Sequence, residues 1–181
     1  MNKPLWQPSK KLKENSLLRD FCKFINFQSS FNFKEIWQWS IDNPNEFWSK
    51  FWDYSKIIGD KGSEIIKKDN VFNKTKFFPD SKLNYTENIL KKKSDKLAIN
   101  FLSEKGFEEN ITWNELYEKV CKFSSYLKKL NLQKGDRVAA YVPNKIESII
   151  CFLACAKNGI IWSSCSPCLL YTSDAADDEL G

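Results

Sequence analysis

The feature that most constrains the fold is the stretch 135–166, which predicts a strand, a helix and a second strand in succession. Residues 137–142 form a short apolar run between a Gly-Asp turn pair and a proline, as a buried strand does. Residues 146–158 contain an unbroken apolar run and stop at Gly159, which suits a helix C-terminus. A second strand then begins at residue 160. Such a unit predicts parallel strands, a right-handed crossover and therefore an α/β fold.

The carboxyl end of the second predicted strand is the candidate functional site. In open α/β sheets, ligands bind beyond the carboxyl ends of the strands. In this chain, that position is occupied by Ser163, Ser164, Cys165 and Ser166. The sequence contains no His, which excludes His-based general bases and mixed Cys/His zinc sites. We assign no catalytic residue and no metal ligand.

The balance of charge limits the class of partner. A net charge of +5 suggests an anionic partner, but only Arg19 and Arg137 among the 28 basic residues are arginines. Proteins that read nucleic-acid sequence favour the bidentate Arg side chain, so we interpret the lysines as a solvated surface. We therefore expect no nucleic-acid partner.

The apolar runs and the cysteines predict the compartment. The amino terminus is polar, and the longest apolar run, 149–156, is too short to span a bilayer. We expect a cytoplasmic protein with no membrane partner and with free thiols. The pairs Cys151/Cys155 and Cys165/Cys168 have ligand-like spacings, but we disfavour a four-thiolate metal site because the first pair lies in the most apolar predicted helix.

The first third of the chain predicts a helical layer that is rich in aromatic residues. Residues 1–15 are expected to form an arm held by Leu5 and Trp6, followed by amphipathic helices beginning near Ser16, Asn32 and Asn43. The aromatic residues recur at the spacing of a buried helix face, which favours scaffold over a base-stacking or peptide-binding platform. The expected buried stripe of the last helix comprises Phe47, Trp48, Phe51, Trp52 and Ser55.

The middle of the chain alternates loops, strands and helices. Residues 57–76 are expected to be a loop-rich connector, and Asn84 should cap a short helix. Residues 97–102 and 107–111 predict two strands around a turn. A long helix should then begin at the capping box Thr112-Trp-Asn-Glu115, with an apolar stripe of Leu116, Val120, Phe123, Leu127 and Leu130.

The last 14 residues differ in composition from the rest of the chain. Residues 168–181 contain four acids and no basic residue, whereas residues 1–167 carry all 28 basic residues. A disordered acidic tail is one interpretation. The string that begins Cys168-Leu-Leu-Tyr-Thr-Ser also resembles translated sequencing-adaptor DNA, and we therefore expect residues 168–181 to be a non-native tail.

Three motifs stand out along the chain. They are Phe78-Pro-x-x-x-Leu-Asn-Tyr-x-Glu-Asn88, Gly135-Asp-Arg-Val-Ala-x-Tyr-Val-Pro-Asn144 and Gly159-x-Ile-Trp-Ser-Ser-Cys-Ser-Pro167. Together they resemble the acetoacetate–CoA ligase family of adenylate-forming enzymes. The resemblance covers residues 4–167, and its last motif is the most specific. Asp80 and Thr86 depart from the family's usual Gly and Ala, and the family's Asp-Phe-Gly is absent after Pro167.

The resemblance implies an organisation and an activity. Residues 1–93 would be an N-terminal helical region of the acetyl-CoA-synthetase type, and residues 94–167 the start of a larger AMP-binding domain. The full enzyme would use ATP, Mg²⁺ and coenzyme A to activate acetoacetate, with Ser163–Ser166 at the rim of a nucleotide or coenzyme A cleft. The family's phosphate loop would lie beyond residue 167, so the fragment itself should be inactive and bind none of these cofactors tightly.

Three alternatives remain open. Residues 163–166 could be merely small residues at the end of a strand. The chain could be a free-standing module that binds polyanions through lysine and aromatic side chains, or part of a related synthetase with another acyl specificity.

Overall fold

The computed structural model describes residues 5–27 and 32–165, which form two compact units divided between Leu83 and Asn84. Each unit has its own buried residues. No helix in the described ranges is both long and apolar enough to cross a membrane. Ser166 and the expected foreign tail, 168–181, lie outside the described residues.

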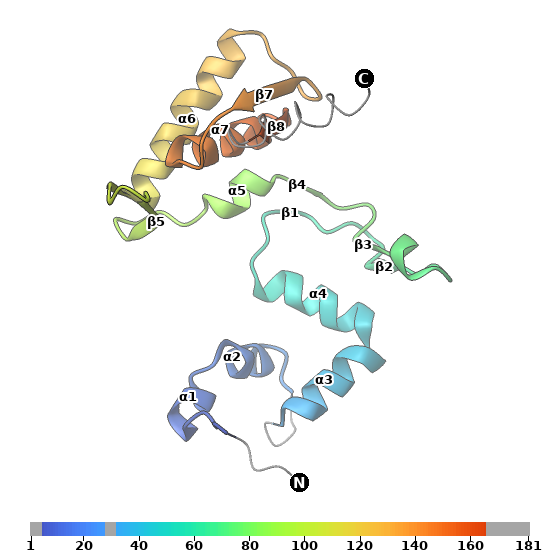
Figure 1. Cartoon of the computed structure of the whole chain (residues 1–181). Coiled ribbons are helices and arrows are strands. Elements are labelled where there is room, and N and C mark those ends of the chain that lie inside the picture. The colour runs from blue at the N-terminus through green and yellow to red at the C-terminus, as the bar shows by residue number, and fades with distance from the viewer. Residues whose placement is uncertain (1–4, 28–31, 166–181) are drawn as a thin grey trace, which may run out of the picture. The chain divides into compact units, whose positions relative to one another are not determined.

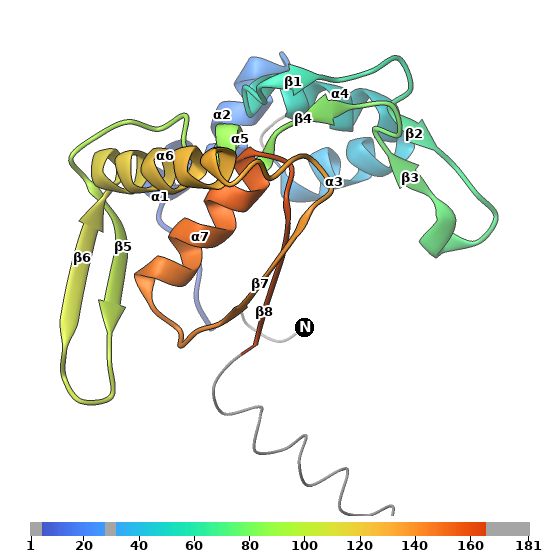
Figure 2. The ribbon, with the colours of Figure 1, turned by 90° about the horizontal axis from the view of Figure 1, so that it is seen from above.

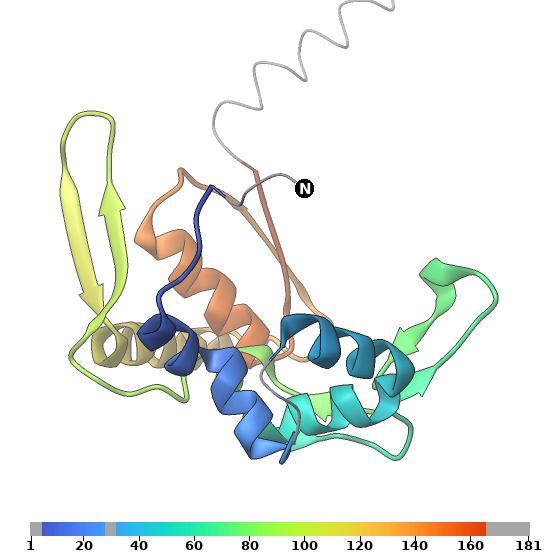
Figure 3. The same cartoon turned by 90° about the horizontal axis from the view of Figure 1, so that it is seen from below.

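The first unit contains four helices followed by two short antiparallel ladders (Figures 1 and 3). The ladders pair β1 with β4 and β2 with β3. The elements are α1 (Lys10–Glu14), α2 (Leu17–Phe24), α3 (Phe33–Asp42), α4 (Pro44–Tyr54), β1 (Gly59–Asp60), β2 (Ile66–Lys67), the 3₁₀ helix η1 (Phe72–Lys74), β3 (Lys76–Phe77) and β4 (Lys82–Leu83).

The helix starts of the first unit follow local signals in the sequence. The side chains of Ser16 and Asn32 accept hydrogen bonds from backbone N–H groups of α2 and α3, which confirms both predicted starts. Helix α4 begins at Pro44 as predicted, but the Asn43 side chain donates to the carbonyl oxygen of Trp39 at 3.2 Å instead of capping α4. The proline alone therefore marks that start, since its fixed φ suits the first helical position.

Two expectations for the first unit are wrong. Residues 1–15 contain helix α1 and are not an arm held by Leu5 and Trp6, because both of these side chains are exposed. The expected buried stripe on α4 is only half-buried, and its member Phe51 is exposed. The connector 57–76 is rich in loops as predicted, and it also contains β1, β2, η1 and the first residue of β3.

The aromatic side chains of the first unit pack around Phe21. Its ring lies edge-on to the rings of Phe47 and Phe51 at 5.9 Å and of Tyr54 at 5.2 Å, between ring centroids. Phe21 is 4% exposed, so it is the most deeply enclosed ring of this cluster. These edge-to-face contacts support the interpretation of the aromatic helices as scaffold.

The second unit contains an antiparallel hairpin, a parallel strand pair and three helices (Figure 2). The hairpin pairs β5 with β6, and the parallel pair is β7 with β8. The elements are α5 (Tyr85–Ile89), β5 (Leu97–Leu102), β6 (Glu108–Thr112), α6 (Trp113–Lys129), β7 (Arg137–Tyr141), α7 (Ile146–Lys157) and β8 (Ile161–Cys165).

The predicted strand–helix–strand unit is confirmed. β7 and β8 are parallel, with Arg137 opposite Ile161 and Tyr141 opposite Cys165. Gly159 has φ of +70°, and an added Cβ there would lie 3.0 Å from the Lys134 side chain. A side chain at this position would therefore be strained, which explains a glycine between α7 and β8.

The main core lies between α6 and α7. Leu116, Val120 and Leu127 are buried on α6 as predicted, and Ile146 and Leu153 are buried on α7. The predicted stripe is wrong at its end, because Leu130 is 52% exposed. Leu130 follows the last helical residue and so leaves the buried face of α6.

A polar contact between α6 and α7 was not predicted from the pattern of apolar residues. Ser124 is buried, and its hydroxyl donates to Oδ1 of Asn158 at 3.1 Å. The Asn158 amide donates in return to the Ser124 carbonyl oxygen at 3.2 Å. The pair joins the middle of α6 to the C-terminal end of α7 and gives the buried Ser124 hydroxyl a hydrogen-bond partner.

Helix α5 packs on α7 through Asn84 and Thr86, which lie within the Phe78–Asn88 motif. Asn84 caps α5, and its amide donates to the carbonyl oxygens of Ala156 and Lys157 at 3.1 and 3.2 Å. Buried Thr86 donates to the carbonyl oxygen of Leu153 at 2.7 Å. These bonds join α5 to the second unit, which begins at Asn84. The expected division into a helical region 1–93 and an AMP-binding domain from residue 94 stays a prediction.

Replacing Glu115 by Gln is expected to make stability less sensitive to acid. Hydrogen bonds from the Thr112 backbone N–H and hydroxyl lower the pKa of Glu115 below its ordinary value of 4.5. A carboxylate of this kind stabilises the fold above its unfolded-state pKa, and the contribution is lost as the pH falls through the folded-state pKa. Gln keeps the capping box but does not titrate. As the pH falls below 4.5, the melting temperature of the parent should decrease by more than that of E115Q. Equal decreases would contradict this account.

Candidate functional site

The candidate site residues lie on the last described strand. Ser163, Ser164 and Cys165 form the carboxyl half of β8, and all three are exposed. Their backbone partners on β7 are Ala139, Ala140 and Tyr141. The fourth predicted residue, Ser166, lies outside the described residues.

The position of this edge is fixed because residues near the start of each strand pack in the core. Val138 on β7 and Trp162 on β8 face each other in the register and pack against the buried residues of the second unit. The ladder continues beyond β7, where the Val142 N–H donates to the Cys165 carbonyl oxygen at 3.4 Å. The strands thus hold their carboxyl ends together, as the crossover predicts.

The three predicted residues offer this edge hydrogen-bonding groups. Two hydroxyls and one thiol can donate to and accept from a ligand, but none of them carries a charge as Lys or Arg does. Such groups can orient a ribose, an amide or a phosphate oxygen, whereas neutralising a triphosphate needs cations. Through these groups the three residues can position a ligand by hydrogen bonds.

Both cysteines of α7 have raised pKa values. Burial raises the pKa of Cys151, and the Glu147 carboxylate raises it further. Burial, and then the neighbouring Cys151, raise the pKa of Cys155. A raised pKa keeps a thiol protonated, and the thiolate is the form that attacks electrophiles and binds metals. Cys155 is buried in the core and Cys151 is half-buried. Cys168, which shares a ligand-like spacing with Cys165, lies outside the described residues.

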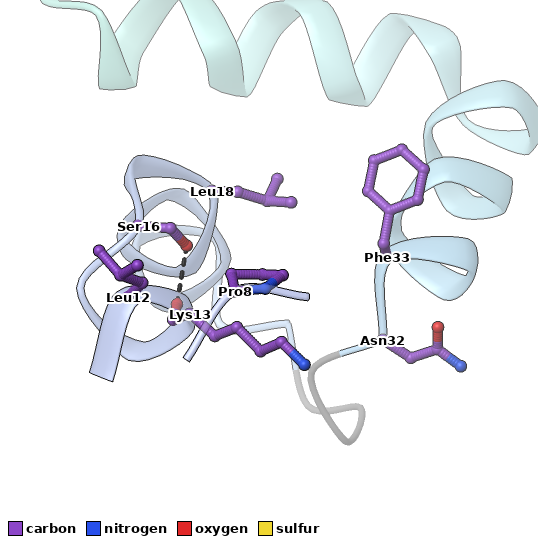
Figure 4. Close-up of a pocket in the computed structure, with 7 residues that line it drawn as sticks. All are labelled: Pro8, Leu12, Lys13, Ser16, Leu18, Asn32 and Phe33. Carbon is purple, nitrogen blue, oxygen red and sulfur yellow. Dashed lines mark hydrogen bonds between the residues drawn. The ribbon is translucent and has the colours of Figure 1, made fainter. Parts of the chain in front are cut away.

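A hollow in the first unit was not predicted from the sequence. It has a volume of about 490 Å³ and lies among α1, α2 and the start of α3 (Figure 4). Among the lining residues of this hollow, the Ser16 hydroxyl donates to the Lys13 carbonyl oxygen at 2.8 Å. Apolar side chains with a single ammonium group can bind but provide no catalytic pair. The lining residues are Pro8, Leu12, Lys13, Ser16, Leu18, Asn32 and Phe33.

Two family models match the chain. The model described as "AMP-binding enzyme" matches residues 86–177, and that described as "Acetyl-coenzyme A synthetase N-terminus" matches residues 33–89. The first match extends ten residues beyond Pro167, into the segment expected to be foreign. The foreign origin of that segment therefore stays a prediction.

Curated relatives and a solved structure align with nearly the whole chain. The acetoacetyl-coenzyme A synthetase of Rhizobium meliloti (strain 1021) is 34% identical over 91% of this chain and 26% of its own length. The Xenopus tropicalis acetoacetyl-CoA synthetase is 37% identical over 91% of this chain and 25% of its own length. The structure of acetoacetyl-CoA synthetase from Streptomyces lividans matches 92% of this chain and 27% of its own, with 25% identity and a TM-score of 0.79. The chain thus spans about a quarter of the length of these relatives.

Proposed function

Because the chain belongs to the AMP-binding enzyme family, we propose that it is the N-terminal part of an ATP-dependent acetoacetate–CoA ligase. In the first step, an acetoacetate carboxylate oxygen attacks the α-phosphorus of ATP, and pyrophosphate leaves. In the second step, the thiol of coenzyme A attacks the acyl carbon, loses its proton, and AMP leaves. The products are acetoacetyl-CoA, AMP and pyrophosphate.

The observation that carries this proposal is the continuity of the structural match. One solved acetoacetyl-CoA synthetase accounts for 92% of the chain at a TM-score of 0.79, so the match includes residues of both units. The curated relatives that share 34% and 37% identity carry the same acyl group in their names. A family likeness confined to the β7–α7–β8 unit would support nucleotide binding alone.

In this proposal the described residues position ligands and leave the chemistry to other segments. Ser163 and Ser164 would hydrogen-bond a nucleotide or coenzyme A at the cleft rim, beside the Cys165 thiol and Ser166. ATP, Mg²⁺ and coenzyme A would be needed by the full enzyme. The described residues do not fit Mg²⁺, since none of them form a group of three or more His, Cys, Asp or Glu that could hold a metal ion.

A related synthetase of other acyl specificity is the second candidate. The match to a model named for acetyl-coenzyme A synthetase favours it, because the match includes most of the first unit. The acyl pocket is not among the features that the described residues form. Substrate choice must therefore be tested in a longer chain.

The test measures pyrophosphate release by a longer chain that contains residues 1–167, with acetoacetate or acetate as the acid. We expect kcat/KM for acetoacetate to exceed that for acetate by at least about tenfold, since an acyl pocket discriminates between acids of different size. Equal values, or a preference for acetate, would reject the acetoacetate assignment and retain the ligase. No release with any short acid would reject the ligase itself.

A further inference from the structure

The hairpin formed by β2, η1 and β3 carries an unusual arrangement of charge. Lys67 on β2 lies directly opposite Lys76 on β3 in the antiparallel register. Side chains that are directly opposed project from the same face with Cβ atoms about 5 Å apart, and like charges in such pairs destabilise a ladder. The ladder contains only two residue pairs, so the like-charge pair makes up half of it.

Two further lysines face the same hollow. Lys67, Lys68, Lys74 and Lys76 line a depression of about 460 Å³ together with Asp69 and Asn73 (Figures 2 and 3 show the hairpin). All four lysines are exposed, and none of the ion pairs among described residues involves them. Four ammonium groups and one carboxylate leave a charge of +3 around the hollow.

Backbone bonds shape the hollow without using the lysines. The carboxylate of Asp69 accepts a hydrogen bond from the Val71 N–H at 2.8 Å, and the Thr75 hydroxyl accepts one from the Asp69 N–H at 3.2 Å. The one acidic side chain in the lining is therefore held by the loop. The ammonium groups stay available to a ligand.

We propose that this hollow binds an anion that carries two or more clustered phosphate groups. A bridging anion would convert the repulsion between Lys67 and Lys76 into two charge-assisted contacts, and the other two lysines would neutralise the remaining charge. The hollow has the size of a small-molecule site, whereas a nucleic-acid polymer would need an extended groove. The site is independent of the ligase proposal, since its residues belong to the first unit and lie outside the candidate cleft rim.

The phosphate cluster could belong to a soluble molecule or to a lipid headgroup. The first arm titrates the 181-residue chain with inorganic tripolyphosphate by calorimetry. The second arm measures flotation with phosphatidylcholine vesicles that contain or lack phosphatidylinositol bisphosphate. Binding in the first arm assigns a soluble ligand, and binding in the second arm alone assigns a headgroup. Failure in both arms overturns the proposal.

The variant that tests the site is K67Q/K76Q, and the matched control is K128Q/K129Q. The control removes the same charge from two exposed lysines of α6 in the second unit. We expect K67Q/K76Q to weaken tripolyphosphate binding by at least about tenfold, since each lost charge-assisted bond contributes roughly a factor of ten or more. The control should bind like the parent chain. Equal binding by K67Q/K76Q and the parent, or an equal loss in the control, would overturn the proposal.

A second measurement separates loss of the site from loss of the fold. Without ligand, K67Q/K76Q should melt at a higher temperature than the parent, because the opposed like charges are gone. Tripolyphosphate should raise the melting temperature of the parent by more than that of the variant at the same concentration. A variant that melts lower than the parent would show that the two lysines serve the fold, which contradicts the proposal.

Discussion

The 181-residue chain is expected to release no pyrophosphate from ATP when acetoacetate, Mg²⁺ and coenzyme A are supplied. Activation of a carboxylate by ATP needs a phosphate-binding loop rich in Gly, Ser and Thr with a lysine, and a second lysine at the acyl phosphate. The sequence contains no such loop. One preorganised group that stabilises developing charge typically contributes about 10²–10³ in rate, so loss of several leaves no measurable turnover.

The control for this prediction is a longer chain in which residues 1–167 are followed by the phosphate-binding loop and the second lysine. Both proteins are assayed for acetoacetate-dependent pyrophosphate release at equal concentration. Turnover by the longer chain alone would support the division of labour between a positioning N-terminal part and later catalytic segments. Turnover by the 181 residues alone would show that their own side chains perform the chemistry, which contradicts this expectation.

Replacing Phe21 by Ala is expected to lower the free energy of unfolding of the first unit by about 3–5 kcal/mol. Phe21 is 4% exposed and lies edge-on to three rings of α4, so its removal leaves a cavity lined by aromatic side chains. Urea unfolding with hydrogen exchange of the α2 and α4 amides would localise the loss. Replacing the half-buried Trp48 by Ala should lower the free energy of unfolding by less, since part of its side chain already contacts solvent.

Trp37→Ala is the matched control for Phe21→Ala. Trp37 is also a large aromatic residue on a helix of the first unit, but it is 53% exposed. Its replacement should change the free energy of unfolding by less than about 1 kcal/mol, as is usual at the surface. Equal losses for the two variants would mean that Phe21 is not the centre of this cluster.

Elements with strong local signals could be predicted from the sequence. The capping box at Thr112 and Glu115 forms as predicted, because it needs only residues three positions apart. The β7–α7–β8 unit also forms as predicted, since an apolar run, a glycine and a second apolar run leave little choice of topology. Asn84 caps α5 for the same local reason.

Elements that depend on distant partners could not be predicted. The two-residue strands β2 and β3 have no apolar alternation of useful length, so only their pairing reveals them. The buried Ser124 is explained by its bond to Asn158, which lies 34 residues later in the sequence. Helix α1 is too polar to show a buried face, and none of its residues is buried.

The position of the candidate site could be predicted from the sequence, but the role of its residues could not. The rule for parallel sheets placed Ser163, Ser164 and Cys165 at a strand end, and the structure has them at the exposed end of β8. Their role depends on a ligand and on further chain segments, neither of which can be read from three small residues. Their assignment to a cleft rim therefore stays a prediction.

The two roles of Asn84 have a consequence for the order of events during synthesis. Its amide reaches the carbonyl oxygens of residues that lie 72 and 73 positions later. A ribosome adds about 5–20 residues per second, so roughly 4–14 s separate the emergence of Asn84 from that of its partners. During that interval α5 lacks its packing surface on α7 and, at five residues, is too short to persist alone. We expect Asn84 and α5 to remain accessible to proteases in nascent chains until α7 has left the exit tunnel.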